Sequence, residues 1–299
     1  MPDHPPPPSM EAMDCPDRPT LPGLWEALAA YPASEWEAQL TCLMEWIARA
    51  IDADNVIWIA TIRAIRGRKA ENDPFLGWRL RGRRPLRPDP EPYQRQLDAY
   101  YSREHYGKLT PTYYQRSHQP QKEAHIGLTS RASMAGAGSF RVHRLRDGWI
   151  DFEAFRRSLH YRLYYEEPGI IDRIWIGFPI NEDRESFFMI DRFQLPGQPP
   201  RQIFTLEEAT LAGDAVRSQP HLQRWLLLGN GLLAGDKLLS PTERQILCEL
   251  LTAKSEKEIA DALGQKQATL HKYITSLYAR FGVNGRAALM ALWLGGRSP

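Results

Sequence analysis

The segment from Leu239 to Trp293 constrains this chain most, because it holds four short helical patterns in about 55 residues. The first begins at Ser240-Pro241-Thr242-Glu243, a capping box with proline at the first helical position, where a missing N–H has no cost. Ser255-Glu256-Lys257-Glu258 repeats the capping box. Gly264 then ends the second helix, because glycine readily adopts the left-handed conformation of that position. The spacing predicts two short helices and a tight turn before a longer third helix.

The third pattern has two distinct faces. Leu270, Ile274, Leu277 and Phe281 recur at helical spacing and lie within about 60° of arc. The opposite face carries short, polar and basic side chains: Ala268, His271, Lys272, Thr275 and Ala279. This order of helices is typical of a helix-turn-helix, in which one helix crosses the DNA backbone and the next lies in the major groove.

A fourth pattern follows from Gly285 to Leu294, with Asn284 as its expected N-cap. It is rich in apolar side chains: Leu289, Met290, Leu292, Trp293 and Leu294. This is more apolar surface than one face of a small bundle needs, so we expect part of it to form a contact between two copies of the chain.

These residues closely resemble the LuxR-type helix-turn-helix. The matching signatures are Leu239-Ser240-Pro241, Glu243-Arg244, Lys257-Glu258-Ile259-Ala260, Leu263-Gly264, Thr269, Gly282-Val283 and Arg286-Ala287. The resemblance covers about a fifth of the chain and implies a four-helix domain whose third helix reads the major groove and whose fourth helix contributes to dimerisation. The chain departs from the family at Thr269-Leu270-His271-Lys272-Tyr273 and at Lys266, which replaces a serine cap. The implied fold survives both departures, whereas the recognised DNA sequence cannot be carried over.

Six residues are the predicted DNA contacts. We expect Lys257, Thr269 and Arg286 to hold phosphates, and His271, Lys272 and Thr275 to face base edges. From Lys237 onward there are nine basic against five acidic residues, while the rest of the chain has 29 against 31. This local positive excess disfavours a helical bundle that does not bind DNA. The fourth helical pattern disfavours the alternative of a sigma-factor region.

The longer N-terminal part predicts an α+β domain. A capping box at Ser34 opens a helix, and a strand follows from Val56 to Ile65. The expected buried residues of this helix are Trp36, Leu40, Leu43, Met44, Ile47 and Ile51. Trp78 to Arg83 alternates apolar and basic residues, as a strand with one wet face would. Further predicted elements are a helix over Asp151–Tyr165, a hairpin over Asp172–Phe193, a helix capped at Phe204-Thr205, and a helix over His221–Leu233. This layout resembles a GAF-like sensor domain, an antiparallel sheet with flanking helices, and the autoinducer-binding domain of quorum sensors is a close competitor.

The expected organisation is a disordered Pro-rich tail (1–20), a GAF-like sensor domain (21–233), a linker (234–238) and the LuxR-type helix-turn-helix domain (239–296). The three cysteines, Cys15, Cys42 and Cys248, have no metal spacing, and no signal peptide precedes them. These features predict a cytoplasmic protein. No apolar run reaches the length of a membrane span, so no membrane partner is expected.

A ligand in the sensor domain would be lined by aromatic side chains over the sheet, for which the candidates are Trp58, Trp78, Trp175, Phe178 and Phe188. The alternative is that these side chains are core only. The scattered histidines have no metal-ligand spacing, so no metal or cofactor is predicted. Arg63 to Arg87 holds nine basic residues, read either as a solvated loop with an edge strand or as a second DNA or anion contact.

Catalysis and phosphorelay control both lack support in the sequence. No phosphate-binding glycine loop, paired-cysteine site or nucleophile elbow is present, and no catalytic residue is predicted. Two function classes remain: a transcriptional regulator controlled by a small molecule, and a constitutive DNA-binding protein whose N-terminal domain mediates dimerisation or protein contacts. The predicted partners are double-stranded DNA, a small-molecule ligand in the first class, and a second copy of the chain on DNA. RNA polymerase is a further candidate partner.

Overall fold

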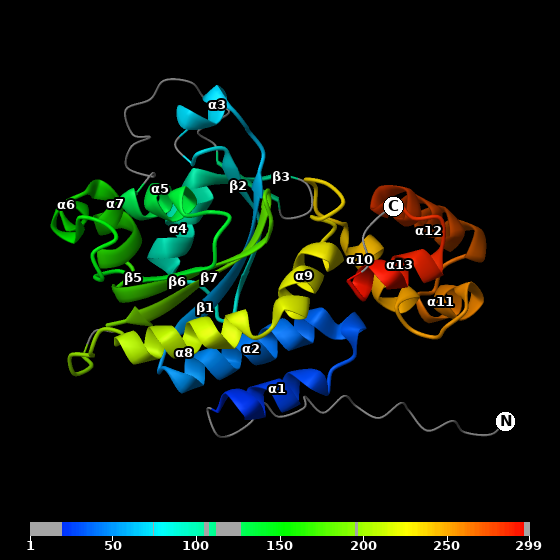
Figure 1. Ribbon diagram of the computed structural model, residues 1–299, viewed down its shortest axis with the longest axis horizontal. Coiled ribbons are helices and arrows are strands. Elements are labelled where there is room, and N and C mark those ends of the chain that lie inside the picture. Colours follow the sequence, from blue (N-terminus) through cyan, green and yellow to red (C-terminus); the bar gives the residue numbers. More distant parts are fainter. Residues whose placement is uncertain (1–19, 74, 105–107, 112–126, 195–196, 296–299) are drawn as a thin grey trace.

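The computed structural model describes residues 20–73, 75–104, 108–111, 127–194 and 197–295 (Figure 1). The predicted Pro-rich tail, residues 1–20, lies outside this range apart from Thr20. Helix α1 (Leu21–Ala29) begins there, and the Thr20 hydroxyl accepts a hydrogen bond from Gly23 N at 3.4 Å. In the part of the chain described, no helix combines the length and the apolar character needed to cross a membrane.

Twelve further α-helices follow α1 in the described residues. They are α2 (Trp36–Ala50), α3 (Arg68–Glu71), α4 (Glu91–Tyr100), α5 (Leu128–Ala135), α6 (Phe152–Arg156), α7 (Leu159–Tyr161), α8 (Leu206–Arg217), α9 (Pro220–Gly229), α10 (Pro241–Leu250), α11 (Glu256–Ala262), α12 (Gln267–Phe281) and α13 (Arg286–Trp293).

The strands form one five-stranded antiparallel sheet and a separate hairpin. They are β1 (Asn55–Arg63), β2 (Trp78–Pro85), β3 (Tyr101–Glu104), β4 (Lys108–Pro111), β5 (Arg141–Arg144), β6 (Ile170–Asn181) and β7 (Arg184–Phe193). The sheet order is β2-β1-β7-β6-β5, with β3 and β4 paired apart from it. The predicted α+β class is therefore confirmed, as is the β6–β7 hairpin.

Helices cover both faces of the sheet (Figure 1). On one face lie α1, α2, α8 and α9; on the other lie α4, α5, α6 and α7. Because successive side chains of a strand point to opposite faces, Trp58 and Phe188 join the first layer, whereas Ile59 and Phe187 join the second. The sheet thus has two separate apolar cores.

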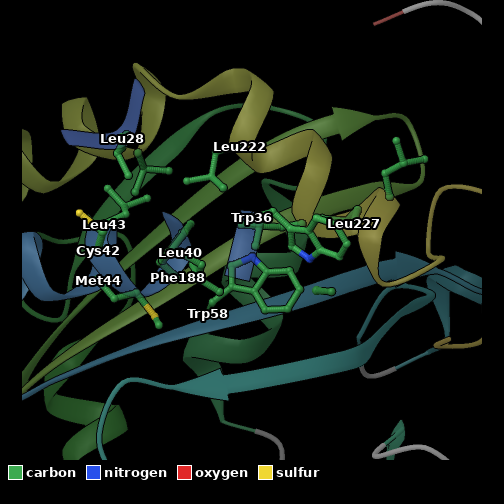
Figure 2. Close-up of a cluster of buried hydrophobic side chains, with 14 of the residues drawn as sticks. Leu28, Trp36, Leu40, Cys42, Leu43, Met44, Trp58, Phe188, Leu222 and Leu227 are labelled. Atoms are coloured by element: carbon green, nitrogen blue, oxygen red, sulfur yellow. The ribbon is translucent and has the colours of Figure 1, made fainter. Parts of the chain in front are cut away.

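The core around α2 is the larger of the two, and it continues into the C-terminal helices. Figure 2 shows Trp36, Leu40 and Leu43 of α2 facing Trp58 and Phe188 of the sheet and Leu222 and Leu227 of α9. The same cluster includes Leu247, Leu277 and Trp293. The Trp36 and Trp293 rings have centroids 5.2 Å apart, so α13 packs directly against α2.

Four local predictions about helices are wrong. Ser34 does not cap α2, because a 3-10 turn over Ala33–Glu35 leads into that helix and Glu35 N bonds Pro32 O at 2.9 Å. Asn284 does not cap α13, whose N-cap is Gly285. The predicted helix over 151–165 is split into α6, α7 and a π-helical turn, because the Ser158 hydroxyl caps a new helix at that point. Helix α9 ends at Gly229, four residues before Leu233.

The prediction that β2 has one wet face is also wrong. Arg79 and Arg81 are each only 6% exposed. The two terminal guanidinium nitrogens of Arg79, Nη1 and Nη2, donate to the Asp73 carboxylate at 2.9 and 2.8 Å. Burying an arginine requires such a partner, and Asp73 was not recognised as one in the sequence. The expectation that this strand lies at an edge of the sheet is confirmed.

Candidate functional site

A cavity of about 140 Å³ lies between the sheet and the helices α4, α5 and α7. Eight of the residues that line it carry rings: Phe75, Trp78, Tyr93, His160, Tyr164, Tyr165, Trp175 and Phe187. The His160 and Tyr164 rings are stacked, with centroids 4.5 Å apart. A flat apolar body would therefore meet ring faces and edges on several sides.

The charged residues of this cavity are already neutralised by partners. Arg173 is buried and bonds the Asp191 carboxylate through both Nε and Nη2, the latter at 2.7 Å. Burial alone would lower the pKa of Arg173, but the adjacent Asp191 outweighs it and raises that pKa well above its ordinary value. Burial raises the pKa of Tyr165 to about 12, so its phenol stays protonated. The cavity consequently offers no free charge from Arg173 to an acidic or basic ligand.

Three polar atoms at the cavity have no hydrogen-bond partner among the described residues. They are Thr61 Oγ1, Ser133 Oγ and Arg83 Nε. Thr61 is 4% exposed and Ser133 is 2% exposed, so bulk water does not satisfy them. A buried polar group without a partner costs about 1–3 kcal/mol, and native proteins tolerate few of them. Their convergence on one cavity points to a molecule that accepts hydrogen bonds there.

The structure places the five predicted ligand residues on both faces of the sheet. Trp78 and Trp175 line the cavity. Trp58, Phe178 and Phe188 do not, because they pack against the core that contains α2. The Trp58 indole N–H instead donates to Ser186 Oγ at 2.8 Å, beneath α9. Sequence reasoning missed Thr61, Ser133 and Arg173. The presence of Arg173 and Asp191 inside two apolar strands was the available signal for a buried pair.

The C-terminal helices have the geometry that the caps predict. Ser240 and Glu243 form a reciprocal capping box at 2.7 and 3.2 Å, and Ser255 and Glu258 form another at 2.7 and 3.3 Å. Those bonds to Ser255 lower the pKa of Glu258. Gly264 has φ +61°, so the turn between α11 and α12 takes the left-handed conformation. Lys266 supplies no side-chain cap to α12, as expected.

Helix α12 buries one face and exposes the other. Leu270, Ile274, Leu277 and Phe281 are at most 4% exposed. The opposite face remains exposed at Ala268, His271, Lys272, Thr275 and Ala279. His271 Nδ1 lies 3.1 Å from Glu256 Oε2, and the Thr275 hydroxyl donates to the His271 carbonyl at 2.9 Å. Lys257 and Thr269 are exposed near the starts of α11 and α12. The Lys272 ammonium is thus an accessible cation on a small-residue surface.

Comparison with known proteins identifies this C-terminal region. Residues 237–293 match the family model for bacterial regulatory proteins of the luxR family. These residues form a LuxR-type helix-turn-helix domain. Over 57 residues the chain is 35% identical to a probable HTH-type transcriptional regulator, GfsR, from Streptomyces halstedii. That match covers 19% of this chain and 24% of the relative, so the chain spans about a quarter of the length of the curated relative it matches.

Two solved structures of SdiA overlap most of the chain. The Escherichia coli SdiA crystal structure is 14% identical, covers 92% of this chain and 95% of that chain, and has a TM-score of 0.35. SdiA in complex with octanoyl-rac-glycerol is 13% identical, covers 92% and 93%, and has a TM-score of 0.36. These scores are too low to carry an argument, so the fold assignment rests on the sheet and helices themselves.

Within the LuxR-type domain, the side chain of Arg286 bonds backbone carbonyls. Its Nε donates to Leu250 O at 2.7 Å and its Nη2 to Glu249 O at 3.3 Å. It also bonds the carbonyls of Thr252 and Lys254. The guanidinium therefore satisfies the carbonyls at the end of α10, which lack partners within the helix. Arg286 thus closes the α10–α11 connection, and its predicted phosphate contact stays a prediction.

The fourth helix of this domain divides its apolar residues between two surfaces. Leu289, Leu292 and Trp293 are buried, and Trp293 is held by three contacts with the rest of the chain. Its ring packs on Trp36, its Nε1 donates to Ala33 O at 3.2 Å, and its carbonyl accepts from Trp225 Nε1 at 2.8 Å. Met290 and Leu294 remain 39% and 81% exposed. Only these last two are available to a second copy of the chain in this arrangement.

Proposed function

We propose that this chain is a sequence-specific transcriptional regulator whose α12 reads the major groove. The observation that carries the proposal is the exposed polar face of α12 within a LuxR-type domain. Two copies would place their α12 helices in successive major grooves about 34 Å apart on a two-fold symmetric site. Lys272 and His271 would meet base edges, and Lys257 and Thr269 would hold phosphates.

The DNA experiment compares Lys272→Ala with Lys257→Ala on a duplex selected from a random pool and on random duplex. Loss of a base contact costs about 1–3 kcal/mol, so Lys272→Ala is expected to remove about 5- to 150-fold of the preference for the selected site. Lys257→Ala is expected to weaken binding to both duplexes alike and to reduce the salt slope by about one. Arg156→Ala, an exposed change on α6, serves as control. Equal losses on both duplexes for Lys272→Ala and Lys257→Ala would contradict these roles.

The regulator is further proposed to respond to a small uncharged molecule in the cavity under the sheet. Its volume is close to the roughly 150 Å³ of a cavity known to bind benzene. The unpartnered hydroxyls of Thr61 and Ser133 and the unpartnered Nε of Arg83 favour a ligand that accepts hydrogen bonds, such as one bearing a carbonyl. The rings around it favour a flat body, and the paired Arg173 and Asp191 disfavour a charged one.

Native mass spectrometry of the full chain purified from its own host tests this proposal. Added mass that disappears on denaturation would identify the ligand, and Thr61→Val with Ser133→Ala should lower its occupancy. Thr210→Val, which removes an exposed hydroxyl on α8, is the matched control. The alternative function, constitutive DNA binding, is favoured by a chain that carries no added mass and whose DNA affinity is unchanged by the cavity variants.

A further inference from the structure

Strand β2 contains a bulge at Arg81. Thr61 of β1 pairs with Leu80, whereas the preceding residue, Ala60, pairs with Gly82. Arg81 is therefore an extra residue with no partner on β1. A bulge of this kind bends the strand and redirects the side chain of the extra residue.

The redirected Arg81 side chain reaches the connection between α9 and α10. Its Nε donates to Asp236 O at 3.0 Å, and the residue is only 6% exposed. Gly82 lies beside the same connection, because a Cβ built there would be 3.8 Å from Leu238 Cδ2. The edge strand of the sheet thus touches the peptide that leads into the LuxR-type domain.

Two further arginines hold that connection from other sides. Arg184 of β7 donates through Nε to Leu232 O at 2.8 Å. Arg280 of α12 donates to Lys237 O and, at 3.5 Å, to Gly231 O. Gly231 has φ +76°, and a Cβ there would lie 2.7 Å from Arg280 Nη2, so glycine permits this approach. The connection between the domains is consequently fixed by both of them.

The cavity lies next to the same bulge. Thr61 and Leu80, the pair that flanks the bulge, both line the cavity. Thr61 Oγ1 is one of the cavity atoms without a partner among the described residues. A molecule bonded to Thr61 and packed on Leu80 would therefore contact the residues beside the bulge, whose backbone sets the direction of the Arg81 side chain.

We infer that the β2 bulge couples the cavity to the DNA-binding domain, with Arg81 as the positioning residue that converts cavity occupancy into a tighter or looser α9–α10 connection. The inference rests on the proposed function for its physiological ligand. A change in the cavity at Thr61 and Leu80 alters how firmly residues 231–238 are held. This change reaches helix α12 because its Arg280 donates hydrogen bonds to carbonyls of the same residues.

Hydrogen–deuterium exchange of the full chain tests the first step. Arg81→Met keeps the aliphatic stem and removes the donor to Asp236 O. Charge-assisted hydrogen bonds are strong enough that exchange within residues 231–238 should rise on the order of tenfold or more. Exchange in β1 and β7 should not change, which shows that the sheet is intact. Arg66→Met is the control, because this side chain is 67% exposed and contacts Asp183 only at the surface. Unchanged exchange over residues 231–238 in Arg81→Met would overturn the inference.

Cavity-filling variants test the second step without an identified ligand. Ser133→Leu places an apolar group in the cavity, and Met134→Phe is the second filler if Ser133→Leu fails to fold. In the native background, either filler should change hydrogen exchange over residues 231–238 by at least about threefold. In a double variant that also carries Arg81→Met, the filler should leave this exchange unchanged, because the two sites are coupled. No response in the native background, or the same response in both, would overturn the coupling. DNA selectivity of the native chain is measured separately. A native chain without DNA selectivity would refute the proposed function and leave the hydrogen-exchange result unaffected.

Discussion

The contact between α2 and α9 predicts the effect of one added methyl group, because Gly229 is in van der Waals contact with the Trp36 ring. A Cβ built on Gly229 would lie 2.3 Å from Trp36 Cε2, 2.5 Å from Cζ2 and 2.6 Å from Nε1. Ordinary carbon contacts are about 3.5–4.0 Å, so the ring would have to move by roughly 1 Å. Trp36 is fully buried and packs against Trp293, so it has no free space to enter.

Gly229→Ala is therefore expected to destabilise the chain. Overpacking of a filled core costs about 1–3 kcal/mol. The greater helix propensity of alanine returns up to about 1 kcal/mol, since Gly229 is the last residue of α9. The net loss in the free energy of unfolding should be about 1–2 kcal/mol.

Urea denaturation followed by tryptophan fluorescence measures this loss. The matched control is Gly235→Ala, where a Cβ would meet nothing within 4 Å, and its stability should stay within about 0.5 kcal/mol of the native chain. If Gly229→Ala is as stable as Gly235→Ala, then Trp36 does not occupy this position in solution. The packing of α9 against α2 described above would then be refuted.

Two further perturbations address the charged and phenolic groups at the cavity. Asp191→Asn should cost about 3–5 kcal/mol in the free energy of unfolding, because it leaves the Arg173 guanidinium buried without a counter-charge. Glu153→Gln in an exposed pair is the control, with an expected loss below about 1 kcal/mol, and an equally small loss for Asp191→Asn would contradict the burial of its pair. The pKa of Tyr165 is raised by burial from its ordinary value of 10.0 to about 12, so the stability that this phenol contributes is complete below pH 10 and is lost as pH rises towards 12. Between pH 9 and 12 the free energy of unfolding should accordingly fall less steeply with pH for Tyr165→Phe than for the native chain. Identical slopes would show that the phenol is hydrated.

The features that could be predicted from sequence are those decided within one or two helical turns. Ser240, Ser255 and Thr205 each have a glutamate three residues later, and all three form the reciprocal caps that this spacing predicts. The buried face of α12 follows from the same kind of local spacing. Ser34 has the same local appearance but fails, because Pro32 starts a 3-10 turn that satisfies the backbone in another way.

The cavity could not be predicted in the same way, because the face to which a strand residue points depends on pairing with distant strands. Trp58 and Trp175 are equivalent as buried aromatic residues in apolar strands. The pairing of β1, β7 and β6 places Trp58 beside Phe188 on the α2 face and Trp175 on the cavity face. Similarly, Arg79 is neutralised by Asp73 through a turn that its alternating pattern did not reveal. The bonds from Arg286 to the carbonyls at the end of α10 could not be predicted either, because they depend on how α13 packs beside that end.

The shared core described around Trp36 has a thermodynamic consequence for the whole chain. A buried cluster that runs from Leu24 through Leu247 to Trp293 has no boundary between the helices packed on the sheet and the C-terminal helices α10 to α13. Helices α10 to α13 therefore belong to the same cooperative unit as the sheet, and they do not form an independent foldon. Any molecule that binds only the folded sheet region stabilises α10 to α13 by the same mass-action term. Conversely, a destabilising change in α2 lowers the population of chains in which α12 is folded.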